Sequence, residues 1–297
     1  MTPRRVPFAR VLPLIAAVAS LAGASRAPAA GGNGPRILAS FYPIYIHLLN
    51  VTAGVPGVTV DLLAPATTGC LHDFALAPGD LVRLSEADAL VINGGGMEHF
   101  LDAARRQRPG LTAIDASRGI DFRPAPGEEP NPHVWLDPAK AAAQVRTIAD
   151  GLAALDPPHA DAYRANAEAY AAKLEDLRRR LTETLAPSRG RAIITFHEAF
   201  PHFARAFGLE IAAVIRREPG SEPSARQLAE TIDLVRRRGI RALFVEPQFP
   251  PRTAETIARE TGGRVYVLDP AVTGPLSPDA YLRIMEANRL ELERALK

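Results

Sequence analysis

The sequence predicts an α/β protein with mainly parallel sheets, arranged in two similar halves on either side of one long helix. From residue 35 onward, short apolar runs alternate with longer segments of helical periodicity, which is typical of βαβ units. The same alternation resumes after residue 190. Between the halves, 161–186 contains neither glycine nor proline, and a helix of that span would be about 39 Å long, enough to connect two lobes.

The first half begins with short apolar runs, each followed by a periodic segment. The expected strands lie at 36–40, 58–63, 89–92 and 111–114, and the expected helices lie at 43–53, 78–86 and 97–105. The stretch 121–132 is rich in proline, glycine and glutamate, so we expect a loop there. Asp137 is a favoured N-cap and Pro138 fits a first turn, so a helix should begin at this pair.

The second half repeats this pattern after the long helix. The expected strands lie at 192–195, 210–215, 242–245 and 264–268, and the expected helices lie at 198–207, 224–238, 252–261 and 278–297. The two halves share no period that aligns residue by residue, so the pattern indicates pseudo-symmetry without a sequence repeat.

The first 24 residues have the features of a cleavable signal peptide. Three arginines precede an apolar run at 11–21, and small residues follow it, with cleavage expected after Ala24 or near Ala30. A transmembrane anchor would need about 20 uninterrupted apolar residues, and charge returns here at Arg26. No cysteine stands where a lipid-modified protein needs one. We therefore expect a soluble periplasmic protein and not a lipoprotein.

Charge and cysteine content narrow the possible functions. Removing residues 1–24 leaves 32 basic and 33 acidic residues, so the mature chain has no electrostatic footprint for nucleic acid. Cys70 is the only cysteine, which excludes an intramolecular disulfide. The remaining length suits two domains of ordinary size around apolar cores.

Four side chains stand just after expected strands or in loops and have the chemistry of zinc ligands. His197 and Asp269 each follow a strand of the second half, while His72 and His133 lie in loops of the first half. Ligands of open parallel sheets bind outside the carboxyl ends of the strands, so these four residues should meet between the lobes. Imidazole nitrogens with one carboxylate suit a tetrahedral divalent ion. Each residue taken alone could equally be a loop histidine, a packing partner or a helix cap.

Several motifs together make the chain resemble a known family, the zinc and manganese substrate-binding proteins of bacterial ABC transporters, of the zinc-uptake type. The resemblance covers nearly the whole mature chain. It is carried by S-F-Y-P at 40–43, H-D-F at 72–74, N-G-G-G at 93–96, P-H-V-W-L-D-P at 132–138, H-E-A-F at 197–200, F-V-E-P at 244–247 and L-D-P at 268–270. The P-H-V-W-L-D-P run and the order of the pieces are the most specific features.

This resemblance implies two Rossmann-like lobes, 35–160 and 190–297, joined by one rigid linker helix at 161–186. It also implies a metal ion held between the lobes by His72, His133, His197 and Asp269. The cargo would pass to an ABC permease in the inner membrane, and we expect a monomer. Members with histidine at the position of His197 resemble zinc binders, whereas manganese binders typically carry glutamate there, so Zn²⁺ is expected and Mn²⁺ is less favoured.

Residues around the ligands are expected to orient them. Asp73, Glu198 and Glu246 are candidates by their position in the sequence, although each could be a cap or a surface charge. Among the other histidines, His99 is the favoured candidate for such a role. The sequence departs from the family at Leu71, where proline is common, and Cys70 beside it is either an extra soft ligand or, as the favoured reading, incidental.

Other functions are less consistent with the sequence. Catalytic zinc usually keeps an open position for water, and neither an H-E-x-x-H nor a G-x-S-x-G motif occurs, so we expect a binding protein and not an enzyme. A receptor for a siderophore or corrinoid would need a broad aromatic or basic cleft, whereas aromatic residues make up 6% of the chain. A manganese or iron receptor remains the closest alternative, with His197 as the discriminating residue.

Overall fold

The computed structural model describes residues 34–71, 74–122, 130–215 and 223–297. Residues 33–297 form one compact unit. The expected signal peptide, His72 and Asp73 lie outside the described residues. Among the described residues, no helix is both long and apolar enough to cross a membrane.

Four parallel strands in the order β2-β1-β3-β4 form the first sheet. The strands are β1 (Arg36–Ala39), β2 (Thr59–Leu62), β3 (Ala89–Ile92) and β4 (Thr112–Asp115). The helices of this half are α1 (Tyr42–Val51), α2 (Pro78–Glu86), α3 (Asp102–Gln107) and α4 (Pro138–Leu155). Because Ala39 is in register with both Leu62 and Val91, the loops after these three strands leave the sheet at one edge.

A second parallel sheet has the corresponding order β6-β5-β7-β8. Its strands are β5 (Ala192–Thr195), β6 (Glu210–Val214), β7 (Ala242–Val245) and β8 (Arg264–Val267). The helices are α6 (Pro201–Phe207), α7 (Ala225–Arg238), α8 (Arg252–Thr261) and α9 (Ala280–Ala295). The pairs Thr195–Phe244 and Val245–Val267 place the ends of β5, β7 and β8 side by side.

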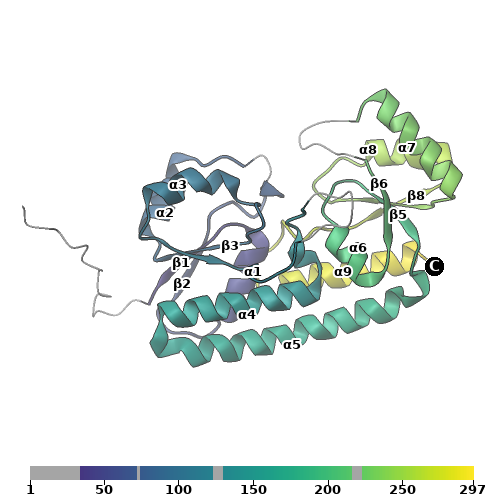
Figure 1. The fold of residues 1–297 in the computed structure, drawn as a ribbon. Helices are drawn as coiled ribbons and strands as arrows, with labels where there is room; N and C mark the ends of the chain where they lie inside the picture. Colours follow the sequence, from purple (N-terminus) through teal and green to yellow (C-terminus); the bar gives the residue numbers. More distant parts are fainter. Residues whose placement is uncertain (1–33, 72–73, 123–129, 216–222) are drawn as a thin grey trace, which may run out of the picture. The chain divides into compact units, whose positions relative to one another are not determined.

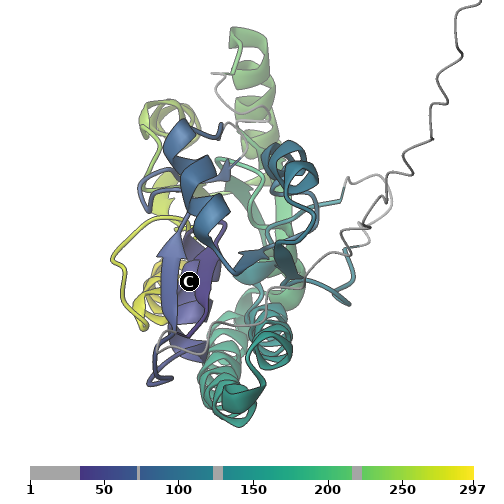
Figure 2. The same ribbon diagram turned by 90° about the vertical axis from the view of Figure 1, so that its left-hand side faces the viewer.

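Helix α5 (Ala160–Leu185) runs beneath both sheets and packs against α1 and α4 of the first half and α6 and α9 of the second (Figures 1 and 2). Its buried face repeats at helical spacing, as in Leu174, Leu177, Leu181 and Leu185. The predicted fold class is therefore confirmed. Each sheet lies within one predicted lobe, while the boundaries of the lobes as separate domains stay a prediction.

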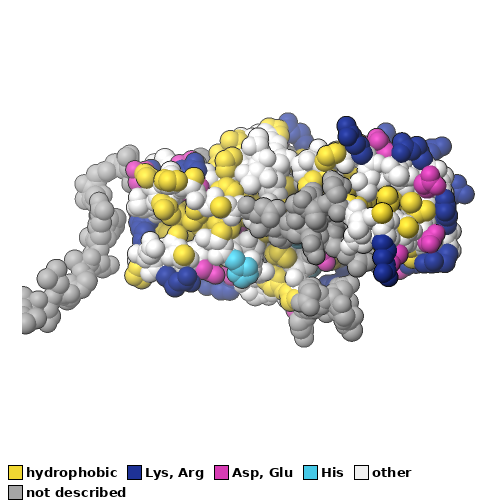
Figure 3. All heavy atoms as spheres, turned by 90° about the horizontal axis from the view of Figure 1, so that it is seen from above, with side chains coloured by type: hydrophobic (Ala, Val, Ile, Leu, Met, Phe, Trp, Pro, Cys, Tyr) yellow, Lys and Arg dark blue, Asp and Glu magenta, His cyan; other side chains and the backbone are white. Residues whose placement is uncertain are grey.

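The main hydrophobic core is continuous between the halves. It contains Ile37 of the first sheet, Leu177 of α5, Phe203 of α6 and Tyr281 of α9. Basic side chains instead gather at the end of the molecule formed by α7 and α8 (Figure 3), where Arg236, Arg237 and Arg238 occupy the last turn of α7. The two halves thus share one apolar interior.

Several expected helices begin later than the sequence suggested, and two of them show a clear physical reason. The helix expected from Glu198 begins at Pro201, because proline has no N–H to donate and fits the first turn. The helix expected from 97 begins with a short 3₁₀ turn, His99–Leu101, after three glycines with positive φ at 94–96. At Gly94 a Cβ would collide with the side chain of Asp115, so this backbone needs glycine.

Candidate metal centre

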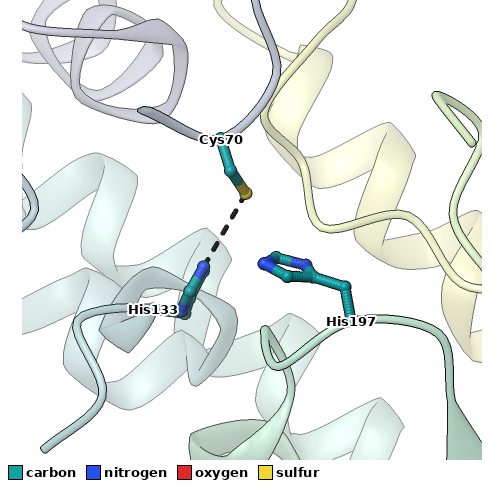
Figure 4. Close-up of side chains that lie close together, drawn as sticks. All are labelled: Cys70, His133 and His197. Atoms are coloured by element: carbon teal, nitrogen blue, oxygen red, sulfur yellow. Dashed lines mark hydrogen bonds between the residues drawn. The ribbon is translucent and has the colours of Figure 1, made fainter. Parts of the chain in front are cut away.

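Loops from both halves bring three metal-ligating side chains together. Cys70 follows β2, His133 precedes α4, and His197 follows β5. One donor atom from each of the three lies within 4.8 Å of the other two. In Figure 4 the thiol and both rings point into one space. The position agrees with the rule that open parallel sheets bind ligands beyond their carboxyl ends.

His133 is buried and held in one orientation. Its Nδ1 lies 3.0 Å from Oδ1 of Asn131, and its backbone N–H donates to the same oxygen at 3.0 Å. Because a carbonyl oxygen only accepts, Nδ1 carries the proton and the neutral ring has its lone pair on Nε2. That nitrogen lies 3.7 Å from Sγ of Cys70. The tautomer therefore suits metal binding through Nε2.

His197 is oriented in the same way by a carboxylate. Its Nδ1 lies 3.0 Å from Oε1 of Glu246, which is buried and follows β7. Gln248 donates to Oε2 of the same carboxylate at 3.0 Å. No lysine or arginine in the described part of the chain forms an ion pair with Glu246. The Glu246 carboxylate thus holds the Nδ1 side of the His197 ring, while its role in metal binding stays a prediction.

Asn131 connects the His133 loop to the second half of the chain. Its side-chain N–H₂ donates to the carbonyl of Glu198 at 2.7 Å, and its own carbonyl lies 2.8 Å from Nε2 of His202. Lys140 donates to Nδ1 of His202 at 2.8 Å, so Nε2–H of His202 donates to Asn131. Glu198 therefore contributes its backbone, and its carboxylate is exposed.

A buried polar network holds the same loop from the side of the first sheet. Asn93, which follows β3, donates to the carbonyl of Pro132 at 2.9 Å. Gln144 of α4 in turn donates to Oδ1 of Asn93 at 2.8 Å. Asn93 at the carboxyl end of the sheet therefore holds Pro132, the residue before His133, and this helps to keep the imidazole of His133 in place.

Asp269 follows β8, and its loop is tied to the His133 loop. The indole N–H of Trp135 donates to the carbonyl of Pro270 at 2.8 Å, and the Trp135 ring lies 5.1 Å from that of His133. Burial raises the pKa of Asp269 to about 6; the N–H of Ala271 opposes this shift and the charge of Glu246 adds to it. Asp269 is not among the donors that meet within 4.8 Å.

Cys70 is positioned by its two neighbours. Gly69 has φ +82°, a conformation that L side chains rarely adopt, and Leu71 is buried in the main core. Burial, together with the nearby Glu246 carboxylate, raises the pKa of the Cys70 thiol. In the absence of a metal the sulfur therefore holds its proton.

Of the four predicted ligands, the structure brings His133 and His197 together, places Asp269 in an adjoining loop, and does not describe His72. His99 has no place in this cluster, because its ring is 82% exposed and pairs with Asp102 at 3.6 Å. Sequence reasoning missed Asn131 and His202. The only signal for Asn131 was its place two residues before His133, since asparagine often bonds the backbone two residues on.

The structure has two parallel β-sheets, each with its helices, bridged by one long helix, and oriented imidazoles lie between the two halves. This arrangement defines a solute-binding protein of the metal-receptor class. The chain belongs to the family described as zinc-uptake complex component A, periplasmic, whose model matches residues 37–295. The predicted family is therefore confirmed.

Individual relatives show the same likeness. The chain is 28% identical over 254 residues to the high-affinity zinc uptake system protein ZnuA of Bacillus subtilis strain 168, covering 80% of this chain and 79% of that protein. It is 27% identical over 261 residues to the zinc-binding protein AdcA of Streptococcus pyogenes serotype M1, covering 79% of this chain and 50% of that protein.

Among solved structures, the SBP FpvC from Pseudomonas aeruginosa in complex with Mn²⁺ superposes with a TM-score of 0.80 at 32% identity. The match covers 88% of this chain and 98% of that chain. Likeness over nearly the full length of this solved SBP supports the two-lobed architecture.

Proposed function

We propose that this protein is a periplasmic high-affinity zinc receptor of an ABC importer, and that it delivers Zn²⁺ to a permease in the inner membrane. The observation that carries the proposal is the buried pair His133 and His197, whose ring centroids lie 5.3 Å apart. Each ring has its Nδ1 held by an oxygen acceptor, as metal-ligating histidines usually do. Membership of the zinc-uptake family supports it.

The proposed ligands are His72, His133, His197 and Asp269. Trp135 supports the inclusion of Asp269, because its bond to Pro270 holds the Asp269 loop against the loop of His133. His72 is included from its place in the H-D-F motif. Four protein ligands would close a tetrahedral site, and this suits a carrier better than a catalyst, which needs an open position.

A manganese or iron receptor is the second candidate. The Mn²⁺ bound in FpvC favours it, and so do the carboxylates of Glu246 and Asp269, since hard oxygen donors suit manganese. Two imidazoles in the described cluster favour zinc, because nitrogen donors bind zinc more tightly than manganese. We therefore retain zinc as the cargo.

The remaining parts of the proposal concern how the receptor works in the cell. We propose a soluble monomer released by cleavage after Ala24 or near Ala30, without a lipid anchor and without enzymatic activity. Lipoproteins occur among the relatives, such as the zinc-binding lipoprotein AdcA of Streptococcus pneumoniae. Mass measurement of the protein recovered from the periplasm distinguishes a cleaved chain from a lipid-modified one.

The test is a metal inventory of the purified mature protein, followed by chelator stripping and competitive titration with zinc and manganese. We expect one zinc per chain and a clear preference over manganese. His197→Ala should weaken zinc binding by more than about 100-fold, since loss of an outer partner alone costs 10–100-fold. His159→Ala is the matched control, because His159 pairs with Asp156 away from the cluster. Unchanged zinc affinity in His197→Ala would remove this residue from the site, and preference for manganese would refute the zinc assignment.

A further inference from the structure

We propose that Cys70 is a metal ligand, and that its thiolate joins His133 and His197 in a sulfur–nitrogen donor set that selects zinc-like ions over manganese. This inference rests on the proposed function. Because a tetrahedral ion takes four ligands, Cys70 would bind in place of one of the four proposed ligands, and it would change the chemistry of the site from nitrogen and oxygen alone to a mixed set that includes a soft donor.

The distances fit a tetrahedral ion. Zinc bonds lie at about 2.3 Å to sulfur and about 2.0–2.1 Å to nitrogen, so a tetrahedral ion separates a sulfur ligand from a nitrogen ligand by about 3.6 Å. Sγ of Cys70 and Nε2 of His133 are 3.7 Å apart. The donor of His197 lies within 4.8 Å of both. A small movement of the His197 ring would therefore complete a three-donor site.

The loop supports the sulfur in this position. Leu71 is 1% exposed and anchors the residue after Cys70 in the main core. Gly69, with its positive φ, makes the turn before it. Fixed neighbours on both sides reduce the conformational cost of ordering the thiol when a metal binds, and Figure 4 shows the thiol directed toward the two rings.

The negative charge and the soft sulfur of a Cys70 thiolate would help the site to select zinc over manganese. Zinc binding forms a metal–sulfur bond and releases the thiol proton to water. With Asp269, the thiolate would supply two negative charges and neutralise a divalent ion. Thiolate ligands select zinc and similar ions, whereas manganese prefers oxygen donors. The sulfur should therefore exclude manganese more strongly than histidine alone can.

A spectroscopic test uses the fact that the chain has a single cysteine. We would replace the metal by Co²⁺ in the reduced mature protein and record its ultraviolet and visible absorption. A sulfur-to-cobalt charge-transfer band can arise only from Cys70, and we expect one band per bound Co²⁺. Stoichiometric cobalt with visible bands but no charge-transfer band overturns this inference and leaves the receptor function intact. Absence of any bound cobalt or zinc overturns both.

Variants provide the second measurement. Cys70→Ser should lose the band, weaken zinc binding by more than about 100-fold and narrow the zinc preference over manganese, because the soft ligand is gone. Thr68→Ala, an exposed change in the same loop, should behave like the wild type. If Cys70→Ser retains wild-type zinc affinity and selectivity, the contact between Cys70 and His133 is only an S–H···N hydrogen bond, and the inference is wrong.

Discussion

At the scale of single residues, the two described histidines depend on the acceptors behind them. Asn131 and Glu246 each accept from an Nδ1–H group and thereby fix both the tautomer and the direction of the ring. One acceptor is neutral and the other is a buried carboxylate. His197 should therefore be the stronger electron donor to a bound metal ion, because a carboxylate partner raises the electron density of the imidazole.

Replacing Glu246 by Gln tests this role. We expect Glu246→Gln to weaken zinc binding by about 10–100-fold, the usual cost of losing an outer-shell partner, while the fold is retained. The affinity can be measured by competition with a chelator of known zinc affinity. Glu255→Gln on α8 is the control, since it changes the charge equally at an exposed position. Equal affinities of the two variants would show that Glu246 does not support the ligand.

At the scale of elements, the carboxyl ends of β1 and β3 are joined by Glu98. This buried carboxylate accepts from the hydroxyl of Ser40 at 2.8 Å and from the backbone N–H groups of Asn93 and Gly94 at 2.6 and 3.1 Å. Burial raises its pKa to about 7, and the three donors oppose that shift. Asn93 also bonds the loop of His133, so the network couples the sheet to the metal site.

Glu98 should make the stability of the metal-free protein depend on pH. Because the folded chain binds this proton more tightly than the unfolded chain, the contribution of Glu98 is fully present below about pH 4.5 and is lost as the pH rises through about 7. At 1.36 kcal/mol per unit, the loss is about 3 kcal/mol. Urea unfolding at several pH values should show this additional loss of unfolding free energy in the wild type and not in Glu98→Gln. Glu86→Gln, at an exposed site, should keep the wild-type dependence of unfolding free energy on pH. The same pH dependence in all three proteins would contradict the prediction.

The bounds of helices and strands could be predicted from the sequence where the residues within or beside the segment determine them. The strands at 89–92 and 192–195 and the helix at 252–261 have their expected bounds, because the apolar runs lie within the two strands, and proline and glycine directly flank the helix. The predicted start of α6, at Glu198, lies three residues before the observed start at Pro201. The helical pattern in the sequence continues on the N-terminal side of the proline, although the helix does not. Local periodicity identifies an element more reliably than it locates the element's first turn.

The site was only partly predictable, because its geometry depends on contacts far apart in the sequence. Cys70 and His133 are 63 residues apart, and His202 bonds Asn131 across 71 residues. Motifs identified the ligand types, and the resemblance supplied the set. No spacing in the sequence indicated that Cys70 would lie beside His133, and a single exported thiol two residues from His72 is more often incidental than a ligand.

At the scale of the whole molecule, the two halves are held together by more than α5. The C-terminal segment returns to the first half, where the hydroxyl of Tyr281 donates to the carbonyl of Trp135 at 2.5 Å and Asn50 donates to the carbonyl of Pro278 at 2.8 Å. These bonds lie beside a shared hydrophobic core. Opening the halves widely would expose buried apolar surface, and each 100 Å² would cost about 2.5 kcal/mol.

We therefore expect metal binding to cause local ordering rather than large closure. Small-angle X-ray scattering of the metal-free and zinc-loaded protein should give nearly superimposable profiles. The thermal midpoint should nevertheless rise with zinc, because a ligand that binds only the folded state stabilises it by mass action, by about 2.7 kcal/mol at one hundred times the dissociation constant. His197→Ala is the control that should lose this thermal shift while keeping the same profile. A marked compaction on zinc binding would mean that the halves rotate as separate bodies and that the bonds of Tyr281 and Asn50 break and reform during the transport cycle.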